Sequence, residues 1–164
     1  LTLKDINVTL VYDIAENLWN QWTDASGNYF PFQSYTYTSD RRHVLQHESN
    51  GNLYYGDSTY FNDYGNKISV DIYTPNFDAN TRRRKHLKLM QFIGDQESGS
   101  YLEARCSDDD YQRWTNFRRV DLSQQNPMLI DCGTFKRRAY HFRHTANTNF
   151  RIQAVEVQYD IGAL

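Results

Sequence analysis

Residues 6–14, INVTLVYDI, alternate apolar and polar side chains with a period of two. The even-numbered positions are apolar and most odd-numbered ones are polar, which is the pattern of a strand with one buried face. The same alternation returns in residues 68–72, 102–106 and 140–144. No segment carries a capped apolar stripe of helical period. The sequence therefore predicts an all-β fold of antiparallel strands, with helix below about one-tenth of the chain.

The chain's length and composition bound the class of protein. Its 164 residues amount to about one domain, and its 15% aromatic content is too high for a disordered chain. No apolar run approaches the roughly 20 residues that a membrane-spanning helix needs, so no such helix is predicted. Because the first residue is not Met and lies close to an expected strand, we expect the chain to be part of a longer protein.

Charge divides the chain into two regions. Residues 1–81 hold four Lys and Arg against ten Asp and Glu, a net charge of −6, whereas residues 82–164 hold fourteen against ten, a net charge of +4. The stretch 75–81, PNFDANT, separates them and is the expected linker. Two domains are therefore predicted, 1–75 and 82–164. The mild positive charge of the second favours a solvated, mixed-sign surface over a nucleic-acid-binding one.

Residues 82–164 are expected to form a β-sandwich with apolar inward faces. Strand parity also turns both cysteines inward as small core residues, and whether they pair is left open. Near Ala154 and Val155 the apolar parity changes, which predicts either a β-bulge or a central strand that is apolar on both sides. The residues assigned to the core are Leu87, Leu89, Leu102, Ala104, Cys106, Ile130, Cys132, Tyr140, Phe142 and Val157.

Little in the sequence indicates catalysis. His141 and His144 fall on opposite faces of one strand, so a shared metal ion is not expected. The acidic run 108–110 lacks the spacing of a calcium loop and is interpreted as a solvated turn. Phosphate-binding glycine loops and a serine nucleophile elbow are missing from the sequence. We therefore expect a protein that is not an enzyme, with no catalytic residue, no metal and no cofactor.

Residues 107–114, SDDDYQRW, are the most informative segment of the chain. They resemble an Asp-box, the Ser-x-Asp-x-Gly-x-x-Trp hairpin of sialidase-like propellers and some β-sandwiches. Ser107, Asp109 and Trp114 match the pattern, and Tyr111 replaces the usual Gly. In such a turn the Ser or Asp oxygen accepts backbone N–H groups and the Trp is buried beneath the hairpin. The box predicts a structural turn, distorted by a side chain where positive φ is often needed.

A wider resemblance appears when the segments are taken in order. They are VYDIAENLWNQW at 11–22, GNLYYGD at 51–57, RRR at 82–84, the box, FKRRAY at 135–140 and FRI at 150–152. This order is similar to the C-terminal part of the packaged-DNA stabilisation or tail-hub (nozzle) proteins of short-tailed bacteriophages. The resemblance implies one or two propeller-blade-like hairpins in residues 1–75, before a terminal β-sandwich.

The resemblance also implies a structural role in the virion. Tail-hub proteins form rings below the portal, line part of the channel that the genome crosses and help to retain packaged DNA. The implied partners are other copies of the chain, the portal, other tail proteins and, in passing, DNA. The residues expected at an interface or against phosphate are Arg82, Arg83, Arg84, Arg118 and Arg119.

Two other functions are compatible with the sequence. A carbohydrate-binding β-sandwich would use exposed Tyr and Trp side chains as sugar platforms, and the chain has thirteen Tyr and three Trp. A sialidase-like glycosidase is suggested by the Asp-box alone. A complete propeller has at least four blades, so an intact active site of that kind is not expected in 164 residues.

Overall fold

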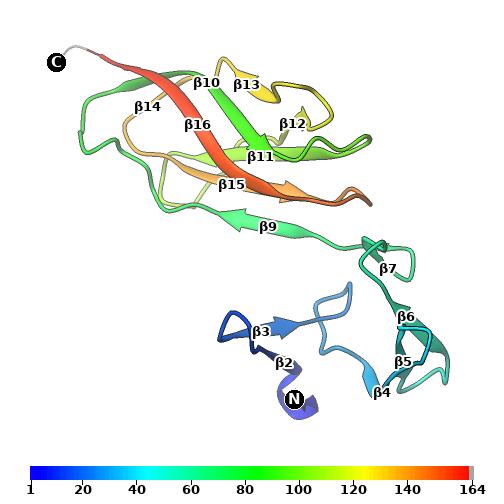
Figure 1. Ribbon diagram of the computed structural model, residues 1–164. Coiled ribbons are helices and arrows are strands. Elements are labelled where there is room, and N and C mark those ends of the chain that lie inside the picture. Colours follow the sequence, from blue (N-terminus) through cyan, green and yellow to red (C-terminus); the bar gives the residue numbers. More distant parts are fainter. Residues whose placement is uncertain (163–164) are drawn as a thin grey trace. The chain divides into compact units, whose positions relative to one another are not determined.

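The computed structural model describes residues 1–162 and is all-β, with 51% strand and 2% helix. All strand pairs in the described residues are antiparallel, and the helical part is a single 3-10 turn, Lys4–Ile6. The predicted fold class is thereby confirmed. The chain forms two compact units that divide between Ile68 and Ser69 (Figure 1). None of the described helical residues belongs to a helix long and apolar enough to span a bilayer.

The first unit is built from short meanders. One three-stranded sheet has the order β1-β2-β3, another has the order β4-β5-β6, and β7 and β8 form a hairpin. A propeller blade has four strands, so each meander among the described residues has one strand fewer than a blade. The strands are β1 (Thr2–Leu3), β2 (Val8–Asp13), β3 (Leu18–Trp22), β4 (Phe32–Tyr37), β5 (His43–His47), β6 (Leu53–Gly56), β7 (Asn62–Asp63) and β8 (Asn66–Lys67).

The second unit is a sandwich of two four-stranded sheets. In the first sheet the long central strand β10 pairs with β13 and β14 on one side and with β16 on the other (Figure 1). The second sheet has the order β12-β11-β15-β9. The strands are β9 (Val70–Tyr73), β10 (Lys85–Gly94), β11 (Tyr101–Ser107), β12 (Arg118–Asp121), β13 (Met128–Ile130), β14 (Thr134–Phe135), β15 (Ala139–His144) and β16 (Ile152–Ile161).

A single apolar cluster joins the two sheets. Both sheets contribute to it, and Phe92 of β10 meets Phe142 of β15 edge to face with ring centroids 5.5 Å apart. Burial of these side chains from two facing sheets is what stabilises a sandwich. The buried members are Leu87, Met90, Phe92, Leu102, Ala104, Val120, Leu122, Leu129, Phe135 and Phe142.

Three residues assigned to the core are not buried in it. Leu89 is only half-buried, Ile130 is 56% exposed and Val157 is 37% exposed. For Leu89 and its partner Ile130 the cause is a bulge: Leu87 pairs with Tyr159 and Leu89 with Gln158, so Lys88 is an extra residue in β10. Val157 pairs with the buried Met90 and shares its face, but it lies on the edge strand β16 and stays partly exposed. Before the bulge the odd-numbered Leu87 faces the core, and after it the even-numbered Met90 and Phe92 do. An extra residue in a strand moves all later side chains to the opposite face.

The parity change in β16 has the same cause. Ile93 pairs with Ala154 and Gly94 with Ile152, so Gln153 is an extra residue in β16. The structure therefore contains the bulge, one residue before the predicted pair Ala154 and Val155. It lies where the backbone of Gly94 comes close to that of Arg151, whose carbonyl oxygen accepts the N–H of Asp95 at 3.1 Å.

The boundary between the units lies before the expected linker. β9 pairs with β15 through four residue pairs, so residues 70–73 belong to the sandwich. The stretch 75–81 is also attached to the second unit, because Phe77 exchanges two backbone hydrogen bonds with Arg138, at 2.8 and 3.0 Å. The Phe77 ring packs against Phe135 and Tyr159. The Phe77 ring and backbone thus attach this Pro- and Asn-rich stretch to the second unit.

Both cysteines are free thiols that line one small cavity of about 40 Å³ in the second unit. Tyr140 lines the same cavity, and its buried hydroxyl has no hydrogen-bond partner among residues 1–162. Burial raises the pKa of the Cys132 thiol, and nearby Arg118 only partly opposes this. Cys132 is therefore a protonated, half-buried thiol at neutral pH.

Candidate interaction surface

The Asp-box-like turn is held by its own Ser and Asp. The Ser107 hydroxyl donates to Asp109 Oδ1 at 2.9 Å and accepts the backbone N–H of Tyr111 at 3.0 Å. Asp109 Oδ1 also accepts the backbone N–H of Arg113 at 2.9 Å, and Oδ2 accepts Arg113 Nε at 2.6 Å. Two turn amides are thereby satisfied by side chains, which fixes the loop between β11 and β12.

Tyr111 adopts the conformation that the missing Gly would favour. Its φ is 69°, and Asp110 before it also has a positive φ of 58°. A bulky residue in this region of backbone space is an outlier that costs free energy. The Tyr111 hydroxyl donates to the backbone oxygen of Thr74 at 3.0 Å, which ties the turn to the segment after β9.

Arginine and the backbone hold the Asp109 carboxylate ionised. The bonds from the Arg113 side chain and its N–H lower the pKa of Asp109 from 3.8 to about 2. A carboxyl with a depressed folded pKa contributes stability above its unfolded pKa, and this contribution is lost as pH falls through the folded pKa. We expect the turn to loosen between pH 3.8 and about 2. An NMR titration of Asp109 and of the Tyr111 amide measures this, and a midpoint near 3.8 would contradict it.

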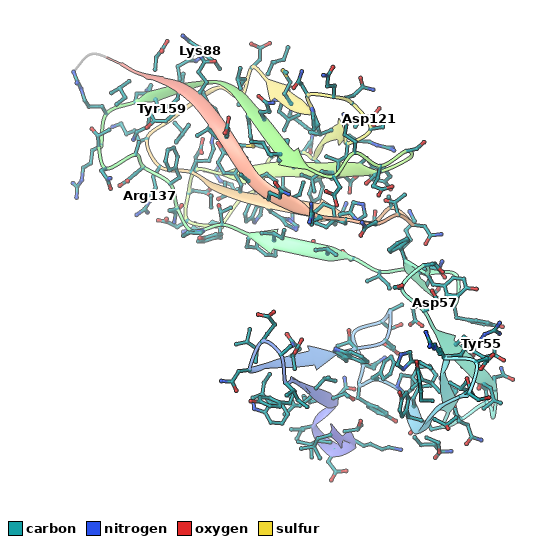
Figure 2. All side chains as sticks on the ribbon, viewed as in Figure 1. Tyr55, Asp57, Lys88, Asp121, Arg137 and Tyr159 are labelled. Atoms are coloured by element: carbon teal, nitrogen blue, oxygen red, sulfur yellow. The ribbon has the colours of Figure 1, made fainter. Side chains whose placement is uncertain are left out.

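The acidic run 108–110 is an ion-paired segment. Asp108 receives two bonds from Arg138, from Nε at 2.7 Å and from Nη2 at 2.9 Å. Asp110 forms an ion pair with Arg137, which lies on the surface of the second unit (Figure 2). Together with the Asp109–Arg113 pair, each of the three carboxylates has its own arginine. The expected solvated turn is thus an ordered one.

Trp114 does not lie in the sandwich core beneath the turn. It is half-buried on the outer face of the second sheet, the face opposite the apolar cluster. Its indole contacts the rings of Tyr73, Tyr111 and His141, with centroids 5.9, 6.0 and 5.8 Å away. These rings and the neighbouring Arg105 cover most of the indole, so Trp114 is mostly buried as expected, but on the outer face of the sheet and not in the apolar cluster.

Around Trp114 the outer face carries stacked arginines and aromatics. The Arg105 guanidinium carbon is 5.1 Å from the centre of Trp114 and 4.5 Å from that of Phe117. Arg143 also lies over Phe117, with its guanidinium carbon 4.1 Å from the ring centre. Guanidinium groups near ring faces are attracted by the ring quadrupole. We call Tyr73, Arg105, Trp114, Phe117, His141 and Arg143 the arginine–aromatic face.

His141 anchors the arginine–aromatic face from beneath. It is 2% exposed, and its ring stacks on Tyr73 with centroids 4.1 Å apart. Arg105 Nε donates to Nδ1 at 2.9 Å, so the ring proton lies on Nε2, which donates to Asp71 Oδ1 at 2.6 Å. Burial opposes ionisation of Asp71, but the hydrogen bonds from Ser69 and His141 prevail and lower its pKa. A histidine covered in this way orients its neighbours and is not accessible to a substrate.

The five arginines assigned to an interface are not brought together. Arg118 and Arg119 point to opposite faces of β12: Arg118 donates to the backbone oxygen of Ile130 at 2.6 Å, and Arg119 lies 3.5 Å from the centre of Tyr101. The other three, residues 82–84, are exposed in the segment before β10. Within residues 1–162 no carboxylate forms an ion pair with any of these three.

The sequence interpretation missed Arg105, His141 and Arg143 as members of one surface. Strand alternation could have identified them, because all three residues alternate with core residues in β11 and β15 and so lie on the outer face. Cross-strand pairing of Arg105 with His141 then places them side by side. Among the described residues no three His, Cys, Asp or Glu side chains converge in a way that could hold a metal ion.

Comparison with protein-family models finds no match for this chain, and comparison with curated proteins finds none either.

Proposed function

We propose that this chain is a structural subunit of a bacteriophage tail hub. Copies of the chain would form a ring in the tail of the virion, which is assembled in the host cytoplasm. The ring would form part of the DNA channel and help to retain the packaged genome. In this role the chain acts through protein interfaces, without catalysis or a cofactor. Its partners are further copies of the chain, the portal and other tail proteins.

The observation that carries the proposal is the arginine–aromatic face. Tyr73 is 55% exposed and the neighbouring Tyr111 42%, while Trp114 and Phe117 are half-buried. Tyr, Trp and Arg are the residue types enriched at the centres of protein interfaces. Because the arginines are already stacked and hydrogen-bonded, little side-chain freedom remains to be lost on association. A rigid surface of this kind supports docking of a protein neighbour.

Unlike charges on the two units support a head-to-tail arrangement of copies. Residues 1–68 hold four basic and eight acidic side chains, a net charge of −4. Residues 69–164 hold fourteen and twelve, a net charge of +2. In a ring each subunit presents two different patches to its neighbours, and opposite signs favour that register over like-with-like contact. The basic unit includes the arginines at 82–84, which form no ion pair among the described residues.

Reversing these three arginines tests the proposal. We expect Arg82→Glu/Arg83→Glu/Arg84→Glu to abolish ring assembly, measured by native mass spectrometry and electron microscopy, while each exposed change alters stability by only about 0.5 kcal/mol. Arg41→Glu, at an exposed site of the first unit, is the control. If the triple variant assembles but its particles lose DNA, the cluster contacts phosphate. If assembly and DNA retention both stay normal, the interface assignment is wrong.

A carbohydrate-binding role is supported by a separate surface of the first unit. Tyr35 and Tyr37 of β4 are 60% and 55% exposed, and both rings contact His43 of β5. Gly56 pairs with His43 on the next strand, and a residue without a side chain leaves the platform open on that side. Exposed aromatic rings of this kind can stack on sugar rings. Binding of the chain to a glycan panel, lost in Tyr35→Ala, would favour this role.

A further inference from the structure

A second feature of the first unit is a cavity of about 240 Å³. It is lined by the loop between β3 and β4, by the β5–β6 hairpin and by the β7–β8 hairpin. Its walls combine aromatic rings with carboxylates. The side chains that matter for its chemistry are Asp24, Phe32, His47, Tyr54, Asp63 and Tyr64.

The aromatic wall is a connected set of rings. Tyr54 is at its centre, with ring centroids 5.4 Å from Phe32, 5.9 Å from His47 and 5.1 Å from Tyr64. The contacts of Tyr54 with Phe32 and with Tyr64 are close to perpendicular. Tyr64 is 75% exposed, so most of this ring is free to contact a ligand at the mouth.

The charge of the lining is negative. Asp24 and Asp63 are ionisable acids, and the lining contains no Lys or Arg. Burial opposes ionisation of Asp24, but the N–H groups of Asn28, Ser26 and Gly27 prevail and lower its pKa. Asp63 uses Oδ2 to accept the N–H of Ala25 at 3.2 Å. Two negative charges beside aromatic rings attract a cation, whereas a neutral sugar gains nothing from the net charge.

The chain also maintains Tyr64 in an unfavourable backbone conformation. Tyr64 and Gly65 are the two loop residues of the β7–β8 hairpin, with φ of 46° and 83°. Positive φ at both positions is the requirement of a type I′ turn, in which Asn-Gly is the favoured pair. Tyrosine at the first position is therefore a poor choice for the turn. A locally unfavourable residue with an exposed ring marks a position kept for contact.

We propose that the cavity receives an arginine side chain from the segment 82–84 of a neighbouring copy. A guanidinium group can stack on Tyr64 and pair with a carboxylate in one geometry, which a lysine ammonium cannot do equally well. The three arginines are exposed and, among the described residues, have no ion-pair partner of their own. That the arginine comes from a second copy of the chain rests on the proposed ring. That the cavity binds a guanidinium group does not depend on the ring.

The test is a titration of the full chain with the peptide ANTRRRKH, which has the sequence of residues 79–86. We expect saturable binding by calorimetry and NMR shifts at Tyr54 and Tyr64. Tyr64→Asn and Asp63→Asn should each weaken binding about tenfold, by removing a cation–π contact or a charge. Asn at position 63 can still accept the Ala25 N–H. Asp57→Asn, an exposed acid after β6 (Figure 2), is the matched control and should bind normally.

Stability separates a contact role for Tyr64 from a structural one. Because Asn suits the first position of the turn, we expect Tyr64→Asn to melt at or above the temperature of the wild-type chain while it loses affinity. The peptides ANTQQQKH and ANTKKKKH should bind more weakly than the arginine peptide. The proposal is overturned if the cavity variants bind normally, if the lysine peptide binds equally well, or if only neutral hexoses bind.

This experiment and the assembly experiment can fail separately. Peptide binding at the cavity without any ring would overturn the tail-hub proposal and leave the guanidinium site standing. A ring that is unaffected by Tyr64→Asn and Asp63→Asn, from a chain that does not bind the peptide, would overturn the site and leave the proposed function standing.

Discussion

Gly94→Ala is expected to destabilise the second unit by about 3 kcal/mol or more, the upper range for forcing extra atoms into a packed structure. A Cβ atom on Gly94 would lie 2.2 Å from the backbone oxygen of Arg151 and 3.2 Å from its carbonyl carbon. The obstacle is backbone, so it cannot be relieved by a change of rotamer. The two strands would have to separate at the bulge, where Asp95 and Arg151 also form an ion pair.

Thermal and urea unfolding measure the effect. Gly56→Ala is the matched control, because it is also a strand glycine without positive φ, and its added Cβ would meet His43 Cβ at an ordinary 3.6 Å. There the change should stay within about 1 kcal/mol and can be stabilising, since alanine reduces the freedom of the unfolded chain. Equal melting temperatures for Gly94→Ala and the wild type would show that the bulge accommodates a methyl group.

The sequence predicts the fold class because period-two alternation survives in the segments where strands form. Residues 102–106 and 140–144 are predicted strands and lie in β11 and β15. The alternation cannot locate an extra residue, however. In the segment KHLKLMQF the apolar residues are Leu87, Leu89, Met90 and Phe92, so either parity is compatible with a buried face until the bulge at Lys88 is known. For this reason the alternation alone assigns Leu89 to the core and leaves out Met90.

The interaction surfaces are harder to predict because their members meet only through tertiary contacts. Parity places His141 opposite the core, but nothing local indicates that Asp71, seventy positions earlier, accepts the hydrogen bond from its ring N–H. The cavity of the first unit combines three connections between strands, each of which looks like an ordinary turn by itself. Only Tyr64 carries a local signal, as a bulky residue before Gly65 where Asn is the favoured choice.

The second large loss of stability is expected on substitution of Arg138, and the adjacent exposed Arg137 is its control. The side chain of Arg138 is 6% exposed, whereas that of Arg137 is 53% exposed. Arg138 donates to Asp108 through two nitrogens and to the backbone oxygens of Cys132 and Thr134. Its guanidinium also lies 4.5 Å from the centre of the Phe135 ring. One side chain thus connects β14, β15 and the Asp-box-like turn.

Arg138→Ala should therefore cost about 2–3 kcal/mol, because it removes a buried guanidinium together with its hydrogen bonds to Asp108, Cys132 and Thr134, while the half-exposed Asp108 carboxylate can regain water. Arg137→Ala removes an equal charge and an ion pair with the half-exposed Asp110, which at an exposed site is worth about 0–1 kcal/mol. Arg138→Lys keeps the charge but not the planar fork, and should fall between the two. Urea unfolding of the three variants measures the order. Similar losses for both alanine variants would mean that net charge, and not the buried hydrogen-bond network, carries the contribution of Arg138.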